Sequence, residues 1–173
     1  MTDAPMTARW VATRDSAKQA AGAFFRLTLR RPRWWLFVAI VELLFAVLFV
    51  LSFDERYAAL TRVVWGPVYA LLPTLAIAGV VLGTGYLLNR RLFGQRLREG
   101  VVLESGIGER SLVLRSPLAE TTLSFDGITS IRSSGNWIFL QHTGSPVLGV
   151  WPAALFPPAD LARMARGIQT RTS

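Results

Sequence analysis

The sequence predicts a membrane protein, in which a two-span transmembrane α-hairpin is followed by a small β-rich domain and a C-terminal helix. Two long apolar segments, residues 34–53 and 63–88, predict the hairpin, because a hydrocarbon core about 30 Å thick needs roughly 20 helical residues. A connection of nine residues, 54–62, makes the two spans neighbours in space. From residue 101 the pattern changes to short runs of β-branched and aromatic residues between turn residues, which is typical of strands.

The net charge of +8 lies beside the predicted spans. Residues 1–33 carry a net charge of +5 and residues 89–98 carry +4, whereas residues 99–173 are neutral. By the positive-inside rule both termini are expected in the cytoplasm, with the short turn outside. The basic flanks also predict attraction to an anionic phospholipid surface, so no excess charge is left to indicate nucleic-acid binding. The residues predicted to anchor the hairpin at the membrane surface are Arg30, Arg31, Arg33, Trp34, Trp35, Arg90 and Arg91.

The basic N-terminal arm, residues 1–33, is expected to be disordered over residues 1–12 and helical from about Ser16. The spacing of Ser16 and Gln19 fits a capping box. Small and apolar residues then recur at helical spacing, which predicts an amphipathic helix lying in the cytoplasmic interface with Phe24 and Phe25 in the acyl boundary. A helix packed on the β-rich domain is the alternative. Pro32 is expected to end this helix.

Glu42 is an acidic residue within the first span, about 12 Å past Trp34 by helix rise. One interpretation is a proton-carrying or partner-binding site. The other is a protonated carboxyl group that is hydrogen-bonded inside the hairpin, to Thr74, to Thr84 or to a freed carbonyl. Neither span has a second acidic or basic residue for a proton relay, so we favour a role in helix packing or assembly.

The second span contains Pro73, which is expected to kink the helix, and two patterns of small residues. Small side chains at intervals of four let helix backbones approach closely. They predict packing either on the first span or on a second copy of the chain. The residues concerned are Gly66, Ala70, Thr74 and Ala78, followed by the pair Gly79 and Gly83. The helix is expected to continue past Leu88 and to end near Gly100 as a cytoplasmic extension.

The cytoplasmic part, residues 101–173, is predicted to contain six strands, at 101–105, 111–116, 120–125, 128–132, 136–143 and 146–151. An amphipathic helix over Ala159–Gln169 follows Pro157 and Pro158. Its apolar stripe is expected to cover an open end of the sheet, because a small barrel left uncovered exposes its core.

The order of these parts resembles the YcxB-like bacterial membrane proteins. The resemblance rests on hydrophobic spacing at Phe125, Ile128, Ile131, Pro152 and Phe156. Phe125 stands where tryptophan is usual, and Ala153 stands where a basic residue is common. The resemblance implies a pleckstrin-homology-like barrel in the C-terminal part and a location in the bacterial plasma membrane, and it brings no catalytic residues.

The sequence offers little for catalysis or for metal binding. Cysteine is absent and His142 is the single histidine, so a zinc site is not expected. Glu104 and Glu109 lack an opposing acid, and the glycines match no phosphate-binding loop. The turn after Gly106 has only Arg110 as a basic residue, which does not support a phosphoinositide pocket. A membrane enzyme would have to depend on His142 or Glu42.

We therefore predict a non-enzymatic protein without cofactor or metal. Its β-rich domain would act as a protein-binding or scaffolding module for a protein partner in the same membrane, where tethering raises the effective concentration. The alternative is an accessory subunit of a larger membrane transporter or enzyme complex, with Glu42, Gly79 and Gly83 at the interface. Homo-oligomer formation is left open.

Overall fold

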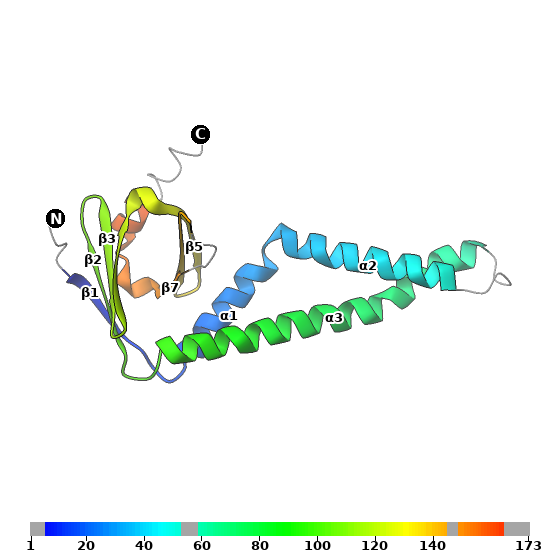
Figure 1. Ribbon diagram of the computed structural model, residues 1–173, viewed down its shortest axis with the longest axis horizontal. Helices are drawn as coiled ribbons and strands as arrows, with labels where there is room; N and C mark the ends of the chain where they lie inside the picture. The colour runs from blue at the N-terminus through cyan, green and yellow to red at the C-terminus, as the bar shows by residue number, and fades with distance from the viewer. Residues whose placement is uncertain (1–5, 53–58, 145–148, 165–173) are drawn as a thin grey trace. The chain divides into compact units, whose positions relative to one another are not determined.

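The computed structural model describes residues 6–52, 59–144 and 149–164. For residues 59–63 it describes the backbone alone. The chain forms two compact units, which Figure 1 shows as a β-rich part and a helical part. The helical unit runs from Phe24 to Asn89. The β-rich unit takes in the chain up to Ala23 and from Arg90 onward, so the N-terminal segment belongs to two units rather than forming one arm.

Three helices lie between the first two strands in sequence: α1 (Ser16–Leu29), α2 (Pro32–Ser52) and α3 (Ala59–Arg96). Pro32 is the first residue of α2, a position at which proline needs no hydrogen-bonded N–H. Pro67 and Pro73 both lie inside α3. The predicted spans fall within α2 and α3, except that Phe53 lies outside the described residues.

Helices α2 and α3 are long and apolar enough to cross a membrane. No described residue of α2 is buried, and only 6% of the most apolar part of α3 is buried. The core helix of a soluble protein would have its apolar side chains covered. The large exposed side chains include Leu43, Leu51, Leu72, Leu75 and Val80.

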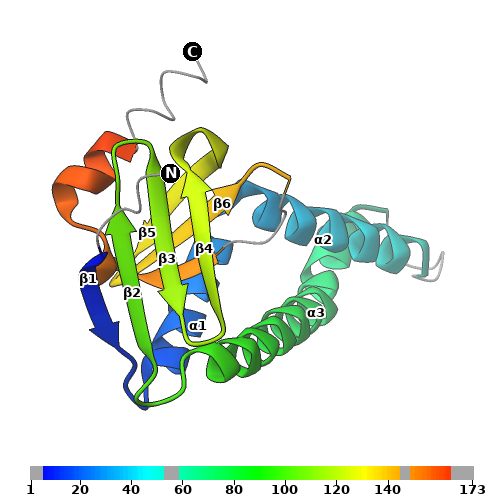
Figure 2. The ribbon, with the colours of Figure 1, turned by 60° about the vertical axis from the view of Figure 1, so that its left-hand side comes forward.

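The β-rich unit contains two antiparallel sheets (Figure 2). The four-stranded sheet has the order β1 (Met6–Val11), β2 (Val102–Ile107), β3 (Ser111–Ser116), β4 (Ala119–Ser124). The three-stranded sheet has the order β5 (Ile128–Ser134), β6 (Trp137–His142), β7 (Gly149–Pro152). Each of the six predicted strands overlaps one of β2 to β7, and residues 145–148 lie outside the described part. The largest fully buried apolar side chains are Leu112, Leu114, Ile138, Phe139 and Leu155.

The prediction of disorder over residues 1–12 is wrong for Met6–Val11, which form β1. This strand pairs antiparallel with β2, with Trp10 opposite Leu103. Side chains along β1 alternate between half-buried and exposed, as expected for a strand with one face toward a core. The three helices are therefore an insertion between two paired strands.

The two ends of this insertion are joined by backbone hydrogen bonds. The N–H of Ala12 donates to the carbonyl of Val101 at 2.8 Å, and the N–H of Gly100 donates to the carbonyl of Ala12 at 2.9 Å. Gly100 has φ +83°, a left-handed conformation that glycine adopts without steric cost. The chain thus leaves the sheet and returns to it at one place.

The C-terminal part closes the β-rich unit. A short 3-10 helix, η2 (Ala153–Leu155), follows β7, and residues 158–164 are helical. Leu155 and Met164 are buried, and the hydroxyl of Ser105 on β2 donates to the carbonyl of Leu155 at 2.5 Å. The predicted helix over Ala159–Gln169 is thus observed as far as residue 164, and its remainder lies outside the described residues.

Candidate functional site

Gly66 is a point at which α3 packs closely on α2. A β-carbon added at Gly66 would lie 2.5 Å from a methyl group of Val50 and 3.3 Å from the carbonyl oxygen of Ala46. Ala70 and Thr74, one and two turns further along α3, are also buried. The first three residues of the four-residue repeat therefore lie on a buried face of the hairpin, as expected for packing on the first span.

Glu42 and Thr74 each have a buried oxygen atom without a hydrogen-bond partner, Oε2 and Oγ1 respectively. Antiparallel helices advance in opposite directions, so two turns from Gly66 to Thr74 correspond to two turns from Val50 to Glu42. The two side chains are therefore at the same level of the hairpin. The hydroxyl of Thr84 donates to the carbonyl of Val80 on its own helix at 2.7 Å. The hydrogen bond predicted for Glu42 is not formed, and unsatisfied polar atoms of this kind are costly in an apolar medium.

Gly79 and Gly83 lie on a different, exposed part of α3. An added β-carbon at either position would meet nothing within 4 Å. Among the residues that the structure describes, none therefore packs against this pair inside the hairpin. It leaves a place where another helix could approach closely.

Of the residues predicted to anchor the hairpin, Trp35 has a local role that the sequence did not indicate. Its indole N–H donates to the carbonyl of Leu29 at 2.9 Å, which satisfies one of the last carbonyl groups of α1. The ring of Trp34 lies 5.6 Å from that of Phe37. Arg30, Arg33, Arg90 and Arg91 are exposed, and Arg31 is half-buried.

Helix α1 differs from the predicted interfacial helix in its first half. Its buried residues there are Ser16, Ala20, Ala21 and Ala23, and this half belongs to the β-rich unit. The hydroxyl of Ser16 accepts a hydrogen bond from the N–H of Thr13 at 2.8 Å. A capping box would need the N–H of Gln19 to donate to this hydroxyl. That N–H donates to the backbone carbonyl of Asp15 instead, so the capping box is not formed. In the second half, the ring of Phe25 packs edge-to-face on Tyr86 at 6.2 Å.

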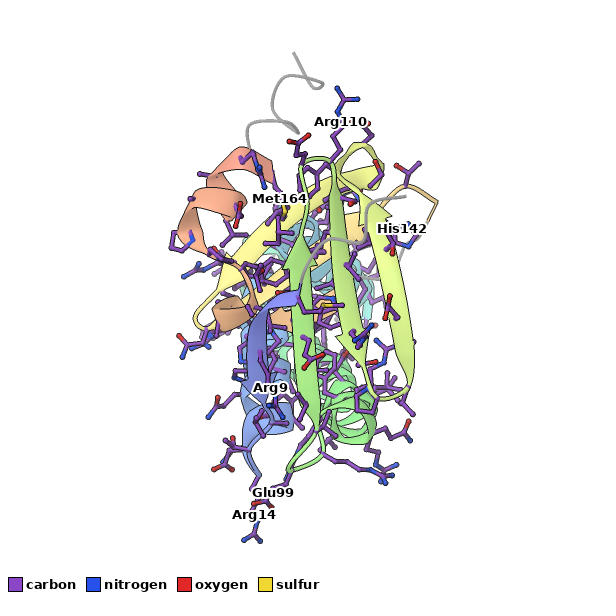
Figure 3. The ribbon with its side chains drawn as sticks, turned by 90° about the vertical axis from the view of Figure 1, so that its left-hand side faces the viewer. Arg9, Arg14, Glu99, Arg110, His142 and Met164 are labelled. Carbon is purple, nitrogen blue, oxygen red and sulfur yellow. The ribbon has the colours of Figure 1, made fainter. Side chains whose placement is uncertain are left out.

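Several of the described titratable residues of the β-rich unit form ion pairs, among them Arg115 with Glu120 at 2.6 Å. His142 is exposed, and its Nδ1 lies 2.8 Å from the carbonyl oxygen of Thr143. Glu104 lies opposite Arg115 on the neighbouring strand, at 3.9 Å. Figure 3 places Glu99 at one end of the unit, with His142 toward the other. Within residues 6–52, 59–144 and 149–164, no three acidic or histidine side chains form a group that could hold a metal ion.

A cavity of about 600 Å³ lies within the β-rich unit, and sequence reasoning did not find it. Three segments far apart in sequence form its walls: the end of α3 with the residues that follow it, the β3–β4 turn, and β7. Its lining includes Arg96, Arg98, Leu103, Leu118, Val150 and Trp151. The volume is in the range of sites that bind small molecules. We call this the junction cavity.

Comparison of the chain with protein-family models, with curated proteins and with solved structures found no match. The resemblance to YcxB-like proteins therefore stays a prediction from the residue pattern. Three features of this molecule bear on its function. These are the exposed apolar helices, the β-rich unit whose strands β1 and β2 flank these helices in sequence, and the buried polar atoms of Glu42 and Thr74.

Proposed function

We propose that this protein is a non-enzymatic integral membrane protein of the bacterial plasma membrane, with both termini in the cytoplasm. Its β-rich unit would be a pleckstrin-homology-like domain that acts as a protein-binding or scaffolding module. The observation that carries the proposal is the insertion of the helices between β1 and β2. Because Ala12 and Val101 are hydrogen-bonded, the domain is tethered through two chain segments rather than through one flexible linker.

Two observations support membrane insertion. The apolar side chains of α2 and α3 are exposed in the structure, so lipid is the medium that would cover them. The excess of arginine lies on the two outer flanks of the hairpin, which favours a cytoplasmic location for both.

The sheet arrangement supports the pleckstrin-homology-like interpretation. Four antiparallel strands form one sheet and three form the other, and the helical residues 158–164 come last. The residues that carried the resemblance include Ile128, Pro152 and Phe156, which are buried in this unit.

The outer edge of β4 offers a surface for a protein partner. In the described part of the chain β4 pairs only with β3, and Glu120, Thr121 and Thr122 are exposed. An unpaired strand edge is a template for the addition of a strand from another chain. A partner confined to the same membrane would need only modest contacts, because the effective concentration is high.

The test compares Thr122→Lys with Gln19→Lys, an equal charge change at an exposed position of α1. Lysine on an edge strand opposes strand addition. Proteins crosslinked to the full-length chain in intact membranes would be identified for each variant. A partner captured by the wild type and by the Gln19 variant, and lost from the Thr122 variant, supports the proposal. Equal capture by both variants would exclude the β4 edge as the binding surface.

The alternative is an accessory subunit that docks through its membrane helices, and Glu42 is the observation that favours it. A buried carboxyl oxygen without a partner could be satisfied by a polar group of another subunit, and the open pair Gly79 and Gly83 would let its helix approach. Glu42→Leu and Gly83→Leu should then dissolve the assembly in mild detergent. Under the protein-binding proposal these variants leave partner capture intact.

A further inference from the structure

The junction cavity combines cationic and apolar groups in a way that selects a particular chemical class of ligand. Arg96 and Arg98 supply two guanidinium groups, and no residue lining the cavity is acidic. The side chains of these two arginines form no ion pair or hydrogen bond with the described residues. Two arginines that line the same cavity without a partner there favour a phosphate group, which guanidinium binds in a bidentate manner.

The rest of the cavity lining is largely apolar. Leu97 and Leu103 are buried, Val150 and Trp151 are half-buried, and Leu118 has 80% of its surface exposed. Leu118 lies in the β3–β4 turn, which the Ser116 hydroxyl fixes by bonding to both backbone groups of Ala119. A large apolar side chain held out at a turn is suited to contact an acyl chain or a glycerol backbone.

The position of the cavity along the chain indicates where such a ligand comes from. Leu88 ends the apolar part of α3, and Arg96 follows eight helical residues later, or about 12 Å by helix rise. The interfacial layer of a bilayer is about 5–8 Å thick on each side. Long arginine side chains bridge the remaining distance.

We propose that the junction cavity binds an anionic phospholipid of the surrounding membrane, with its phosphate group between Arg96 and Arg98 and its apolar part against Leu118 and Trp151. This inference rests on the proposed membrane location and not on the protein-binding role. The site is specific, in contrast to general attraction by the basic flanks. Its ligand is a lipid because a free phosphate would leave the apolar wall uncovered.

The test uses the full-length protein in detergent, titrated with phosphatidylglycerol or phosphatidylcholine and analysed by native mass spectrometry. The double variant Arg96→Gln/Arg98→Gln removes both cavity charges, and Arg110→Gln/Arg132→Gln makes the same charge change at exposed arginines of the β-rich unit outside the cavity. We expect the cavity variant to bind phosphatidylglycerol roughly 30-fold more weakly, at about 1 kcal/mol per basic residue. The control should lose no more than about threefold.

Further measurements distinguish lipid binding from the binding of a free phosphate compound and from a folding defect. Glycerol phosphate should not displace the lipid, and Leu118→Ser should weaken lipid binding without changing the preference for the anionic headgroup. Arg96→Lys/Arg98→Lys keeps the charges but loses the bidentate geometry, so it should bind more tightly than the glutamine variant and more weakly than the wild type, which excludes misfolding as the cause. Three results would each overturn the proposal. The first is an equal loss of lipid binding in the cavity and control variants, and the second is equal binding of phosphatidylglycerol and phosphatidylcholine. The third is a lipid-free dimer whose formation depends on these arginines. Carbonate extraction of membranes tests the location independently.

Discussion

Strand β1 should be an integral part of the β-rich unit, and Trp10→Ala tests this most sharply. The ring of Trp10 packs edge-to-face on Trp137 at 5.8 Å, and Trp137 is only 3% exposed. Truncation of a fully buried tryptophan costs about 3–5 kcal/mol. Trp10 is half-buried, so we expect a loss of about 2–3 kcal/mol in the free energy of unfolding, including the edge-to-face contact.

The assay is pulse proteolysis of the full-length protein in detergent as the temperature rises, with cleavage followed in the β-rich unit. For a domain of about 100 residues the expected loss lowers the midpoint by about 8–24 °C. Arg9→Ala is the matched control, because Arg9 is the exposed neighbour on the same strand, and it should change the stability by less than about 0.5 kcal/mol. A Trp10 variant as stable as the control would refute the assignment of β1 to this unit.

Three other substitutions test a helix contact, a hydrogen bond and a backbone turn. Gly66→Ala should destabilise the hairpin by about 1–3 kcal/mol through overpacking against α2, whereas Gly79→Ala should be neutral. Thermal unfolding in detergent compares the two variants, and equal midpoints would contradict the packing at Gly66. Ser105→Ala leaves the carbonyl of Leu155 without its hydrogen bond and should lower the free energy of unfolding by about 1–3 kcal/mol. The proteolysis assay measures this loss, and an unchanged midpoint would argue against the hydrogen bond between Ser105 and Leu155. Gly100→Ala forces a left-handed alanine and should cost about 1–2 kcal/mol, visible as faster cleavage beside β2, and unchanged cleavage would contradict the left-handed turn.

The sequence predicted the elements whose signals are local. Residues 34–53 are apolar except for Glu42 and Ser52, so any helix long enough to include them presents a largely apolar surface. The strands β2 to β7 are also short runs bounded by turn residues. Pro32 was correctly expected to separate α1 from α2, because proline lacks the N–H that a continuous helix requires.

The elements that were missed depend on contacts distant in sequence. Thr7 and Ser105, on β1 and β2, are 98 residues apart, so nothing near Met6–Val11 indicates the partner strand. The alternation of Met6, Ala8 and Trp10 with more polar neighbours was a weak signal that could have suggested a strand. The junction cavity was missed for the same reason, since three separate segments build it.

For the candidate assembly site, the sequence identified Glu42 but could not supply its surroundings. Side-chain partners depend on helix rotation and register, which the contact of Gly66 with Val50 fixes in the structure. The same contact separates the small residues into a buried group and an open pair, Gly79 and Gly83. Spacing alone could not make this distinction, because both groups repeat at intervals of four.

The central claim is that the hairpin crosses the membrane and returns, with both flanks in the cytoplasm. Because the chain has no cysteine, single cysteines can be placed at Ala58 and at Ser173 and treated with a membrane-impermeant maleimide on intact cells. The account predicts that the cysteine at position 58 is labelled from outside, and that the cysteine at position 173 is labelled only after the cells are opened. Labelling of position 173 on intact cells, or protection of both until lysis, would contradict it.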